Sequence, residues 1–233
     1  SAAISPTAAF YDSFEADQGW TVSNGTGLTS GSWERAVPTA TGTAVPTTDG
    51  DGSGMCYLTS NSQDVDVDGG TTTLTSPRMD ARAPDARLQF WWYHRNNTTS
   101  DNLNAEVSFN DGGSWVQVAN CAGFVRPWTH FDIDLTDVSG YAPTAMFRVR
   151  FTTRDVSTDG TVESAVDGVA IWSVRCLVPC SGDLDASGAV DGVDLGILLG
   201  NWDGSGVGDI DGSGVVDGTD LGSLLGDWGD CDG

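Results

Sequence analysis

The chain has 233 residues, enough for one large β domain and a small additional module. Its formal net charge of −23 argues against partners such as nucleic acid or an anionic membrane surface, because both require Lys and Arg. All ten basic residues are Arg, which excludes chemistry based on a Lys nucleophile, and the acidic balance points to a cation, with calcium as the leading candidate.

The chain begins with a small-residue arm, residues 1–9, followed by a body, residues 10–175, that is β throughout. Short runs rich in Val, Phe, Trp, Tyr and Thr alternate with clusters of Gly, Asp, Asn and Pro, and none keeps a helical period. The clearest predicted strands are 19–23, 55–59, 88–94, 105–109, 130–135, 146–152 and 169–174. This spacing predicts a two-sheet β-sandwich of the jelly-roll type.

The cysteines and the N-terminus bear on the compartment. The five cysteines show no zinc-ligand spacing, and they are Cys56, Cys121, Cys176, Cys180 and Cys231. In an oxidising compartment they would form two disulfides and leave one thiol. The chain starts at Ser1 rather than Met, which suggests a processed end, and no apolar run approaches the ~18 residues that span a bilayer. We therefore expect an extracellular or cell-surface protein without a membrane span.

After a short linker, residues 176–181, the composition changes to a gapless repeat in which 182–202 and 208–228 align at a period of 26 residues. Each copy contains a twelve-residue loop with oxygen side chains at positions 1, 3, 5, 9 and 12, and position 7 contributes its backbone carbonyl. The expected ligands are Asp183, Asp185, Ser187, Ala189, Asp191 and Asp194, and then Asp209, Asp211, Ser213, Val215, Asp217 and Asp220. Position 6 is Gly188 or Gly214, where the chain must turn. The pattern predicts two calcium ions.

Four apolar residues at the spacing i, i+3, i+4, i+7 follow each loop and predict a helix with one apolar stripe. They are Leu195, Leu198, Leu199 and Trp202, and then Leu221, Leu224, Leu225 and Trp228. Glycines within both helices cost roughly 1 kcal/mol each. Residues 181–233 also hold twelve Asp and no Arg, so their charges repel. We expect residues 182–233 to be largely unfolded without metal.

These loop–helix copies resemble the type I dockerin repeat over nearly all of residues 182–230. The resemblance implies a pseudo-twofold module that binds a cohesin domain through loop positions 10 and 11. Those positions hold Gly192-Val193 and Gly218-Thr219 here, rather than the Ser-Thr type of pair common in cellulosomal dockerins.

The stretches FEADQGWTV, GSWERAVP, DGDGSGMCYLT, DVDGGTTTLTSP and VESAVDGVAI resemble bacterial extracellular jelly-roll modules of the MAM-like and cleaved-adhesin kind, over about residues 10–175. In such sandwiches an ion often ties the first strand to the last. The resemblance implies a third calcium site, and the matching carboxylates are Glu15, Asp66, Asp68 and Asp167. The alternative is that these are exposed turn carboxylates.

Two further motifs have structural explanations. Residues 108–115, Ser-Phe-Asn-Asp-Gly-Gly-Ser-Trp, resemble an Asp-box hairpin turn, in which polar groups cap the backbone and the Trp anchors it. Trp91, Trp92 and Tyr93 are consecutive, so at least one ring points away from the core, where it would stack on a sugar or pack at an interface. The sequence contains no G-x-S-x-G, HExxH or P-loop motif, so we expect no enzyme activity.

We therefore expect a non-catalytic calcium-binding structural protein that assembles head to tail, as a filament or surface layer, through its dockerin-like module and N-terminal arm. The alternatives are a carbohydrate-binding or cohesin-binding adhesion module, and accessory domains of a secreted hydrolase. We also expect Cys180 to pair with Cys231, because they bracket the repeats, and Cys56 to pair with Cys121.

Overall fold

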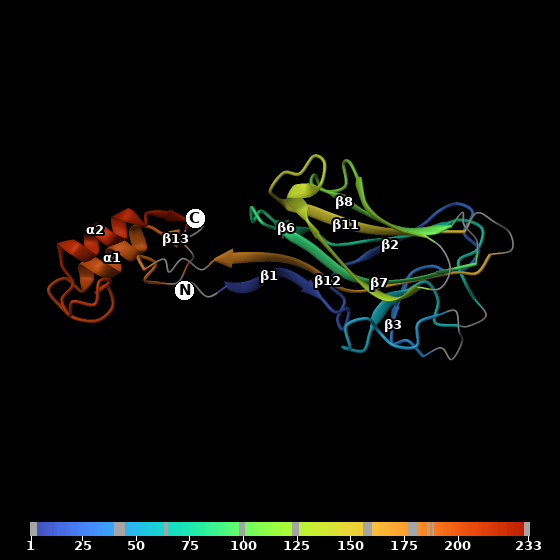
Figure 1. The fold of residues 1–233 in the computed structure, drawn as a ribbon, viewed down its shortest axis with the longest axis horizontal. Coiled ribbons are helices and arrows are strands. Elements are labelled where there is room, and N and C mark those ends of the chain that lie inside the picture. The colour runs from blue at the N-terminus through green and yellow to red at the C-terminus, as the bar shows by residue number, and fades with distance from the viewer. Residues whose placement is uncertain are drawn as a thin grey trace. The chain divides into compact units, whose positions relative to one another are not determined.

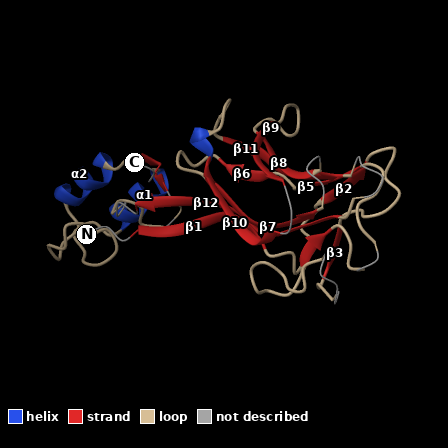
Figure 2. Cartoon of the chain, turned by 45° about the vertical axis from the view of Figure 1, so that its right-hand side comes forward, coloured by secondary structure: helices blue, strands red, loops and turns tan. Residues whose placement is uncertain are grey.

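The computed structural model describes residues 4–39, 45–62, 65–97, 101–122, 126–155, 160–176, 181–185, 187 and 189–230. The chain divides into two compact units, one formed by Thr7–Ser173 and one formed by Val174–Gly233 together with Ser1–Pro6. The strands make up most of the first unit, and both α-helices belong to the second (Figure 2).

Two antiparallel six-stranded sheets form the β-sandwich, with layers that are visible in Figure 1. The first sheet runs β10 (Arg126–Asp134), β7 (Arg87–Asn96), β12 (Val162–Cys176), β4 (Cys56–Leu58) and β3 (Glu34–Ala36), and β1 (Ile4–Asp12) also pairs with β12. The second runs β2 (Thr21–Asn24), β5 (Thr71–Thr75), β11 (Thr144–Arg154), β8 (Asn102–Ser108) and β9 (Val116–Ala122), and β6 (Met79–Ala81) pairs with β11. A short 3-10 helix, η1 (Leu135–Asp137), follows β10. The predicted fold class is confirmed.

The N-terminal arm differs from its expected role. Residues 4–9 belong to β1, which pairs with β12 of the same chain, and the two strands run side by side in both ribbon views. The strand that we expected to join a neighbouring subunit therefore already has a partner within its own sheet.

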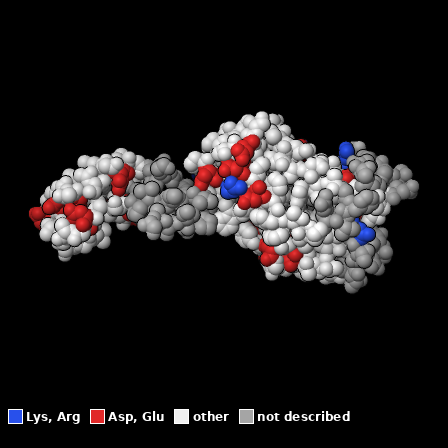
Figure 3. Space-filling model, in the orientation of Figure 1, with Lys and Arg blue, Asp and Glu red and all other residues white. Residues whose placement is uncertain are grey.

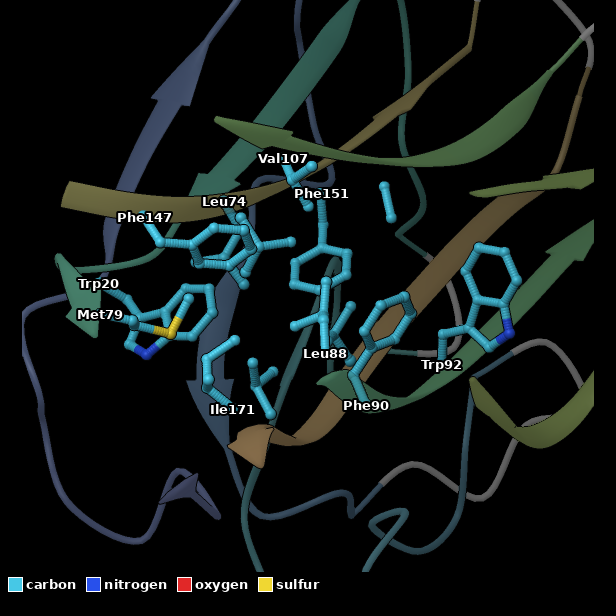
Figure 4. Close-up of a cluster of buried hydrophobic side chains, with 14 of the residues drawn as sticks. Trp20, Leu74, Met79, Leu88, Phe90, Trp92, Val107, Phe147, Phe151 and Ile171 are labelled. Atoms are coloured by element: carbon cyan, nitrogen blue, oxygen red, sulfur yellow. The ribbon is translucent and has the colours of Figure 1, made fainter. Parts of the chain in front are cut away.

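The core lies between the two sheets and is built by alternation along each strand. On β7, Leu88, Phe90 and Trp92 belong to this core, and Phe90 meets Phe151 of β11 in the opposite sheet (Figure 4). The Phe90 and Phe151 rings meet edge to face, with their centroids 4.9 Å apart. A fully buried side chain of this size contributes about 2–3 kcal/mol by leaving water, so this cluster holds the sheets together.

The C-terminal unit contains two copies of a loop and a helix. Its elements are β13 (Ala189–Val190), α1 (Gly192–Gly200), α2 (Gly218–Gly226) and β14 (Gly229–Asp230), and β13 pairs with β14. A Cβ on Gly182 would lie 3.2 Å from the Leu224 Cα on α2, and a Cβ on Gly208 would lie 3.4 Å from the Leu198 Cα on α1. Each repeat therefore packs its leading glycine against the helix of the other.

The apolar stripes of α1 and α2 are only partly buried. Leu198 and Leu224 are fully buried and form a small core with Val190 and Val216. The other half of each stripe faces solvent, with exposed fractions of 50% for Leu199, 41% for Trp202, 52% for Leu225 and 50% for Trp228. The sequence predicted one apolar stripe on each helix, and the structure adds that Trp202 and Trp228 lie beyond the ends of α1 and α2.

The structure contains no disulfide between Cys56 and Cys121, and their expected pairing is not formed. Cys56 lies on β4 in the first sheet, whereas Cys121 lies on β9 at the edge of the second, and they belong to different buried clusters. Cys180 and Cys231 lie outside the described residues. Within the described part of the chain, no helix has the length and apolar character needed to cross a membrane.

Candidate metal centres

Each loop of the C-terminal unit gathers three carboxylates. Asp183, Asp185 and Asp194 form one triad, in which one oxygen atom of each residue lies within 4.8 Å of the others. Asp209, Asp211 and Asp220 form the second triad in the same way. In the space-filling view, this part of the molecule shows red carboxylates and no blue side chain, as expected for a segment without Arg or Lys (Figure 3). Each triad could hold a metal ion.

The carboxylate at loop position 12 organises each loop. Asp220 Oδ1 accepts hydrogen bonds from the backbone N–H groups of Ile210 and Asp211, at 2.7 and 3.1 Å, and its Oδ2 accepts one from Asp217 at 2.8 Å. These backbone donors, that of Asp217 first, hold the pKa of Asp220 below its ordinary value, so the carboxylate stays ionised.

The first loop repeats this arrangement. Asp194 Oδ1 accepts hydrogen bonds from Leu184 and Asp185 at 2.8 and 3.2 Å, and its Oδ2 accepts one from Asp191 at 2.8 Å. The backbone donor at Asp191 is the main cause of the lowered pKa of Asp194. Position 12 therefore supplies a buried, ionised carboxylate that accepts three backbone hydrogen bonds in both loops.

The remaining predicted ligands divide into two groups. Ser187 Oγ donates to the Ala189 carbonyl and Ser213 Oγ donates to the Val215 carbonyl, each at 3.2 Å, so positions 5 and 7 lie together. Asp191 and Asp217 are not members of the triads. They are the N-caps of α1 and α2, and each accepts a hydrogen bond from the backbone N–H two residues ahead. Gly188 lies outside the described residues.

One buried oxygen tests whether the second loop fits a cation. Asp209 Oδ2 accepts a hydrogen bond from the Gly214 N–H at 2.8 Å, whereas Asp209 Oδ1 is buried with no hydrogen-bond partner among the described residues. An unpaired buried oxygen is costly, and a bound cation beside it would remove that cost. The loop therefore fits calcium, which prefers oxygen ligands.

A third triad lies in the sandwich, where Asp49 and Asp51 meet Asp167 of β12. Asp167 Oδ2 accepts hydrogen bonds from the backbone N–H groups of Gly50 and Asp51, at 2.7 and 3.0 Å. Asp167 is fully buried, and burial raises the pKa of its carboxyl group to about 7. A buried acid among other carboxylates is the environment that a cation would stabilise.

This sandwich loop has the local structure of the C-terminal loops. The Ser53 N–H donates to Asp51 Oδ1, as the Ser213 N–H does to Asp211 Oδ1, each at 2.9 Å. The Gly54 N–H donates to Asp49 at 2.9 Å, matching the bond between Gly214 and Asp209. Asp167 then accepts from loop positions 2 and 3, as Asp220 does. The sandwich loop is therefore closed by a carboxylate from a distant strand.

A fourth triad consists of Asp66, Asp68 and the buried Asp155. Asp66 Oδ2 accepts a hydrogen bond from the Val162 N–H at 2.9 Å, and Asp68 Oδ2 accepts one from Ser30 Oγ at 3.0 Å. Burial is the main cause of the raised pKa of Asp66. This triad lies apart from the loop that Asp167 closes.

The expected set of Glu15, Asp66, Asp68 and Asp167 is thus not one site. Asp66 and Asp68 join Asp155, whereas Asp167 joins Asp49 and Asp51. Glu15 lies beside the latter loop, where its Oε1 accepts hydrogen bonds from the Met55 N–H at 2.5 Å and from Ser53 Oγ at 3.2 Å. Glu15 belongs to neither triad.

The sequence prediction missed Asp49, Asp51 and Asp155 as candidate ligands. Asp49 and Asp51 could have been found from the sequence, because 49–54 resembles the start of the second C-terminal loop. Residues 49–54 read Asp-Gly-Asp-Gly-Ser-Gly, and 209–214 read Asp-Ile-Asp-Gly-Ser-Gly. Asp155 had no comparable sequence signal, since it follows the end of β11 in a stretch without a loop motif.

The Asp-box turn between β8 and β9 is structural. Ser108 Oγ accepts a hydrogen bond from the Gly112 N–H, and Asn110 Oδ1 accepts one from the Ser114 N–H, each at 2.8 Å. Asp111 forms ion pairs with Arg78 and Arg148. The polar side chains of the motif therefore form hydrogen bonds that stabilise the turn, as expected.

The two antiparallel sheets define the class of β-sandwich modules, here with an acidic loop that a carboxylate of the central strand β12 closes. Residues 13–177 match the family model described as "MAM domain, meprin/A5/mu", and the chain belongs to this family. Comparison with curated proteins finds none that matches. MAM domains are typically extracellular.

Solved structures give weaker similarities. The K1 cleaved adhesin domain of Lys-gingipain from Porphyromonas gingivalis W83 is 16% identical at a TM-score of 0.47, covering 71% of this chain and 98% of that one. The family 11 carbohydrate-binding module from Clostridium thermocellum is 11% identical at a TM-score of 0.39, covering 69% and 92%. The enzymatically active domain of tailspike protein 4 from bacteriophage CBA120 is 18% identical at a TM-score of 0.39, covering 70% and 20%. Similarities this low carry no functional argument.

Proposed function

We propose that this protein is a calcium-stabilised, non-catalytic extracellular binding protein with three calcium loops. The observation that carries the proposal is the repetition of one hydrogen-bond pattern in two C-terminal loops and in one sandwich loop. In each, a buried Asp accepts from the backbone of loop positions 2 and 3, and the carboxylates at positions 1 and 3 converge on it. Calcium, when bound, supplies the positive charge that offsets these carboxylates.

In the C-terminal loops, the calcium ligands would come from positions 1, 3, 5, 7 and 12, while position 9 caps the helix. In the sandwich they would come from Asp49, Asp51, Ser53 and Asp167, with Glu15 at the rim. The Asp66, Asp68 and Asp155 triad lacks the loop pattern, so calcium binding by Asp66 and Asp68 stays a prediction.

Two features support a binding role. MAM domains are typically extracellular and non-catalytic. The C-terminal unit exposes a Leu and a Trp at equivalent positions of its two repeats, Leu199 with Trp202 and Leu225 with Trp228. Large contiguous apolar patches mark interaction sites, and we propose that these exposed side chains contribute to a docking surface on the dockerin-like module.

Head-to-tail self-assembly is a finer form of this proposal. Because β1 pairs with β12 in its own chain, the exposed Leu and Trp side chains of the C-terminal unit are the remaining support for assembly. Static light scattering of concentrated protein in millimolar calcium tests it, and a mass that stays monomeric at every concentration counts against it.

Calcium titration of metal-stripped protein by isothermal calorimetry tests the calcium proposal. We expect at least three sites per chain. Asp194→Asn, Asp220→Asn and Asp167→Asn should each remove one site, because each takes the organising charge from one loop. Asp203→Asn is the matched control, since Asp203 is exposed in the C-terminal unit and outside the triads. A site count unchanged by Asp167→Asn would contradict the sandwich loop.

A further inference from the structure

The outer face of the first sheet carries an aromatic and polar strip. On β7 the residues between the core side chains, Arg87, Gln89 and Trp91, point away from Leu88 and Phe90 of the core. Trp91 is half-buried although it lies outside the core between the sheets. The strand pairing therefore determines which side chains lie beside it on this face.

Three rows cross the sheet from β12 through β7 to β10 in the strand register. The first row is Asp167, Trp91 and His130, and the Trp91 and His130 rings lie 4.9 Å apart between centroids. The middle row is Ala170, Gln89 and Asp132, and the last is Trp172, Arg87 and Asp134. A small and polar middle row is thus flanked by a tryptophan on each side. Trp91 and Trp172 are offset by four residues along the strands, about 13 Å.

The polar groups of the strip hold one another in place. Asp132 Oδ1 accepts from Arg87 Nε at 2.9 Å, and Asp132 Oδ2 accepts from Gln89 Nε2 at 3.1 Å. Arg87 Nη1 also donates to Asp134 at 3.2 Å. About a third of each charged side chain stays accessible, so each keeps donors or acceptors for a ligand. Fixed polar groups lose little entropy on binding.

The sandwich loop positions Trp91. A Cβ on Gly168 would lie 3.1 Å from Trp91 Cδ1, and a Cβ on Gly50 would lie 2.8 Å from Trp91 Cβ. Both glycines flank carboxylates of the third triad, so an ordered loop fixes the tryptophan at the edge of the strip.

We propose that this strip binds an uncharged polysaccharide, with Trp91 and Trp172 as stacking platforms and Gln89, Arg87 and Asp132 as hydroxyl partners. Aromatic rings present an apolar face to the C–H groups of a sugar, while paired polar groups bond its hydroxyls. Arg87 is offset by two carboxylates, and the net charge of −23 repels anionic chains. The inference rests on the proposed binding role and names the ligand class.

Affinity gel electrophoresis of the full chain in millimolar calcium tests the strip, with xylan and mixed-linkage β-glucan as neutral probes and alginate as the anionic one. We expect retardation by a neutral probe and none by alginate. Trp91→Ala and Trp172→Ala should each weaken retardation about tenfold, the effect of losing one stacking ring. Trp172→Phe should restore part of it. Trp115→Ala, in the turn that precedes β9 of the other sheet, should leave it unchanged.

Calorimetric calcium titration of the same variants separates this inference from the calcium proposal. Calcium binding by Trp172→Ala that matches the wild type, together with weakened retardation, supports the strip. Wild-type protein that binds calcium but is not retarded by either neutral probe overturns the strip and leaves the calcium proposal standing. Retardation by alginate alone, or equal losses in Trp172→Ala and Trp115→Ala, overturns it as well.

Discussion

Asp167 Oδ2 lies 3.0 Å from the backbone nitrogen of Asp51, although 116 residues separate the two in the sequence. The same carboxylate atom also accepts from Gly50 at 2.7 Å. Strand β12 thus supplies the carboxylate that accepts from the backbone of the sandwich loop. In each C-terminal loop, the Asp at position 12 supplies that carboxylate. An ion held here would connect the loop before β4 to the centre of the first sheet.

Asp167→Asn should lower the stability of the sandwich in calcium and have less effect without it. Binding to the folded state alone stabilises by about 3 kcal/mol at ~100 times the dissociation constant, and the variant should lose most of that gain. Thermal unfolding with and without EGTA measures the difference. Asp17→Asn is the control, because Asp17 is exposed and the Asn carbonyl can still accept from the Gly19 N–H. Equal calcium-induced shifts in both variants would argue against an ion at Asp167.

Asp220→Asn should uncouple α2 from calcium. The substitution removes the charge that the Ile210, Asp211 and Asp217 N–H groups surround, and the small core of the unit does not offset the repulsion among its carboxylates. Circular dichroism near 222 nm should show that calcium restores less helix in the variant than in the wild type. The calcium concentration at the midpoint of this recovery should be roughly tenfold higher or more. Asp203→Asn should behave as the wild type, since Asn tolerates the left-handed φ of 62° at this position. Helix content that EGTA does not change would reject calcium-coupled folding.

The buried His94 should make the sandwich sensitive to acid. Burial lowers the pKa of His94 from 6.5 to about 4, and its Nδ1 shares a hydrogen bond of 2.9 Å with Ser164 Oγ. Above pH 6.5 both folded and unfolded states hold a neutral imidazole, so its contribution is fully present. Between pH 6.5 and 4 only the unfolded state takes up the proton, which costs about 3 kcal/mol in total.

Urea unfolding from pH 7 to pH 4 in saturating calcium measures this loss against His94→Asn, which has no titrating ring. The difference in unfolding free energy between the two proteins should shrink as the pH falls. A constant difference would show that His94 does not set the acid sensitivity.

The Cys56 thiol should be inert in the folded protein. It is fully buried, so a reagent in solution cannot reach the sulfur. Burial also raises its pKa well above the usual range, so almost none of the thiol ionises to the reactive thiolate. Maleimide labelling followed by peptide mapping should find Cys56 unmodified in calcium and modified in denaturant. Rapid labelling of native Cys56 would contradict its burial.

Cys180 should pair with Cys231 because the two bracket the repeats. Closing a loop of this length contributes about 4 kcal/mol in the chain-entropy model. Peptide mapping without reduction identifies the bond, and a Cys176–Cys180 bridge would disprove the pairing.

The most accurate sequence inferences were those that depended on local patterns. The strands predicted at 88–94 and 146–152 are parts of β7 and β11. They could be predicted because the alternation of apolar residues is visible within the sequence of each strand. The C-terminal triads were also predictable, because each loop draws its ligands from one continuous segment. The grouping of Asp66, Asp68 and Asp167 failed, because no local pattern states which strands become neighbours.

The sequence by itself determined the class of fold, the duplicated acidic loops and the helices that follow them, since these depend on spacing within about a dozen residues. Only the tertiary structure decided that Asp167 closes the sandwich loop, that β1 pairs with β12, and that half of each helix stripe faces solvent. The physical reason is that strand pairing and burial depend on contacts between segments far apart in the chain. Such contacts are selected by the packing of the whole core, which a single sequence pattern does not record.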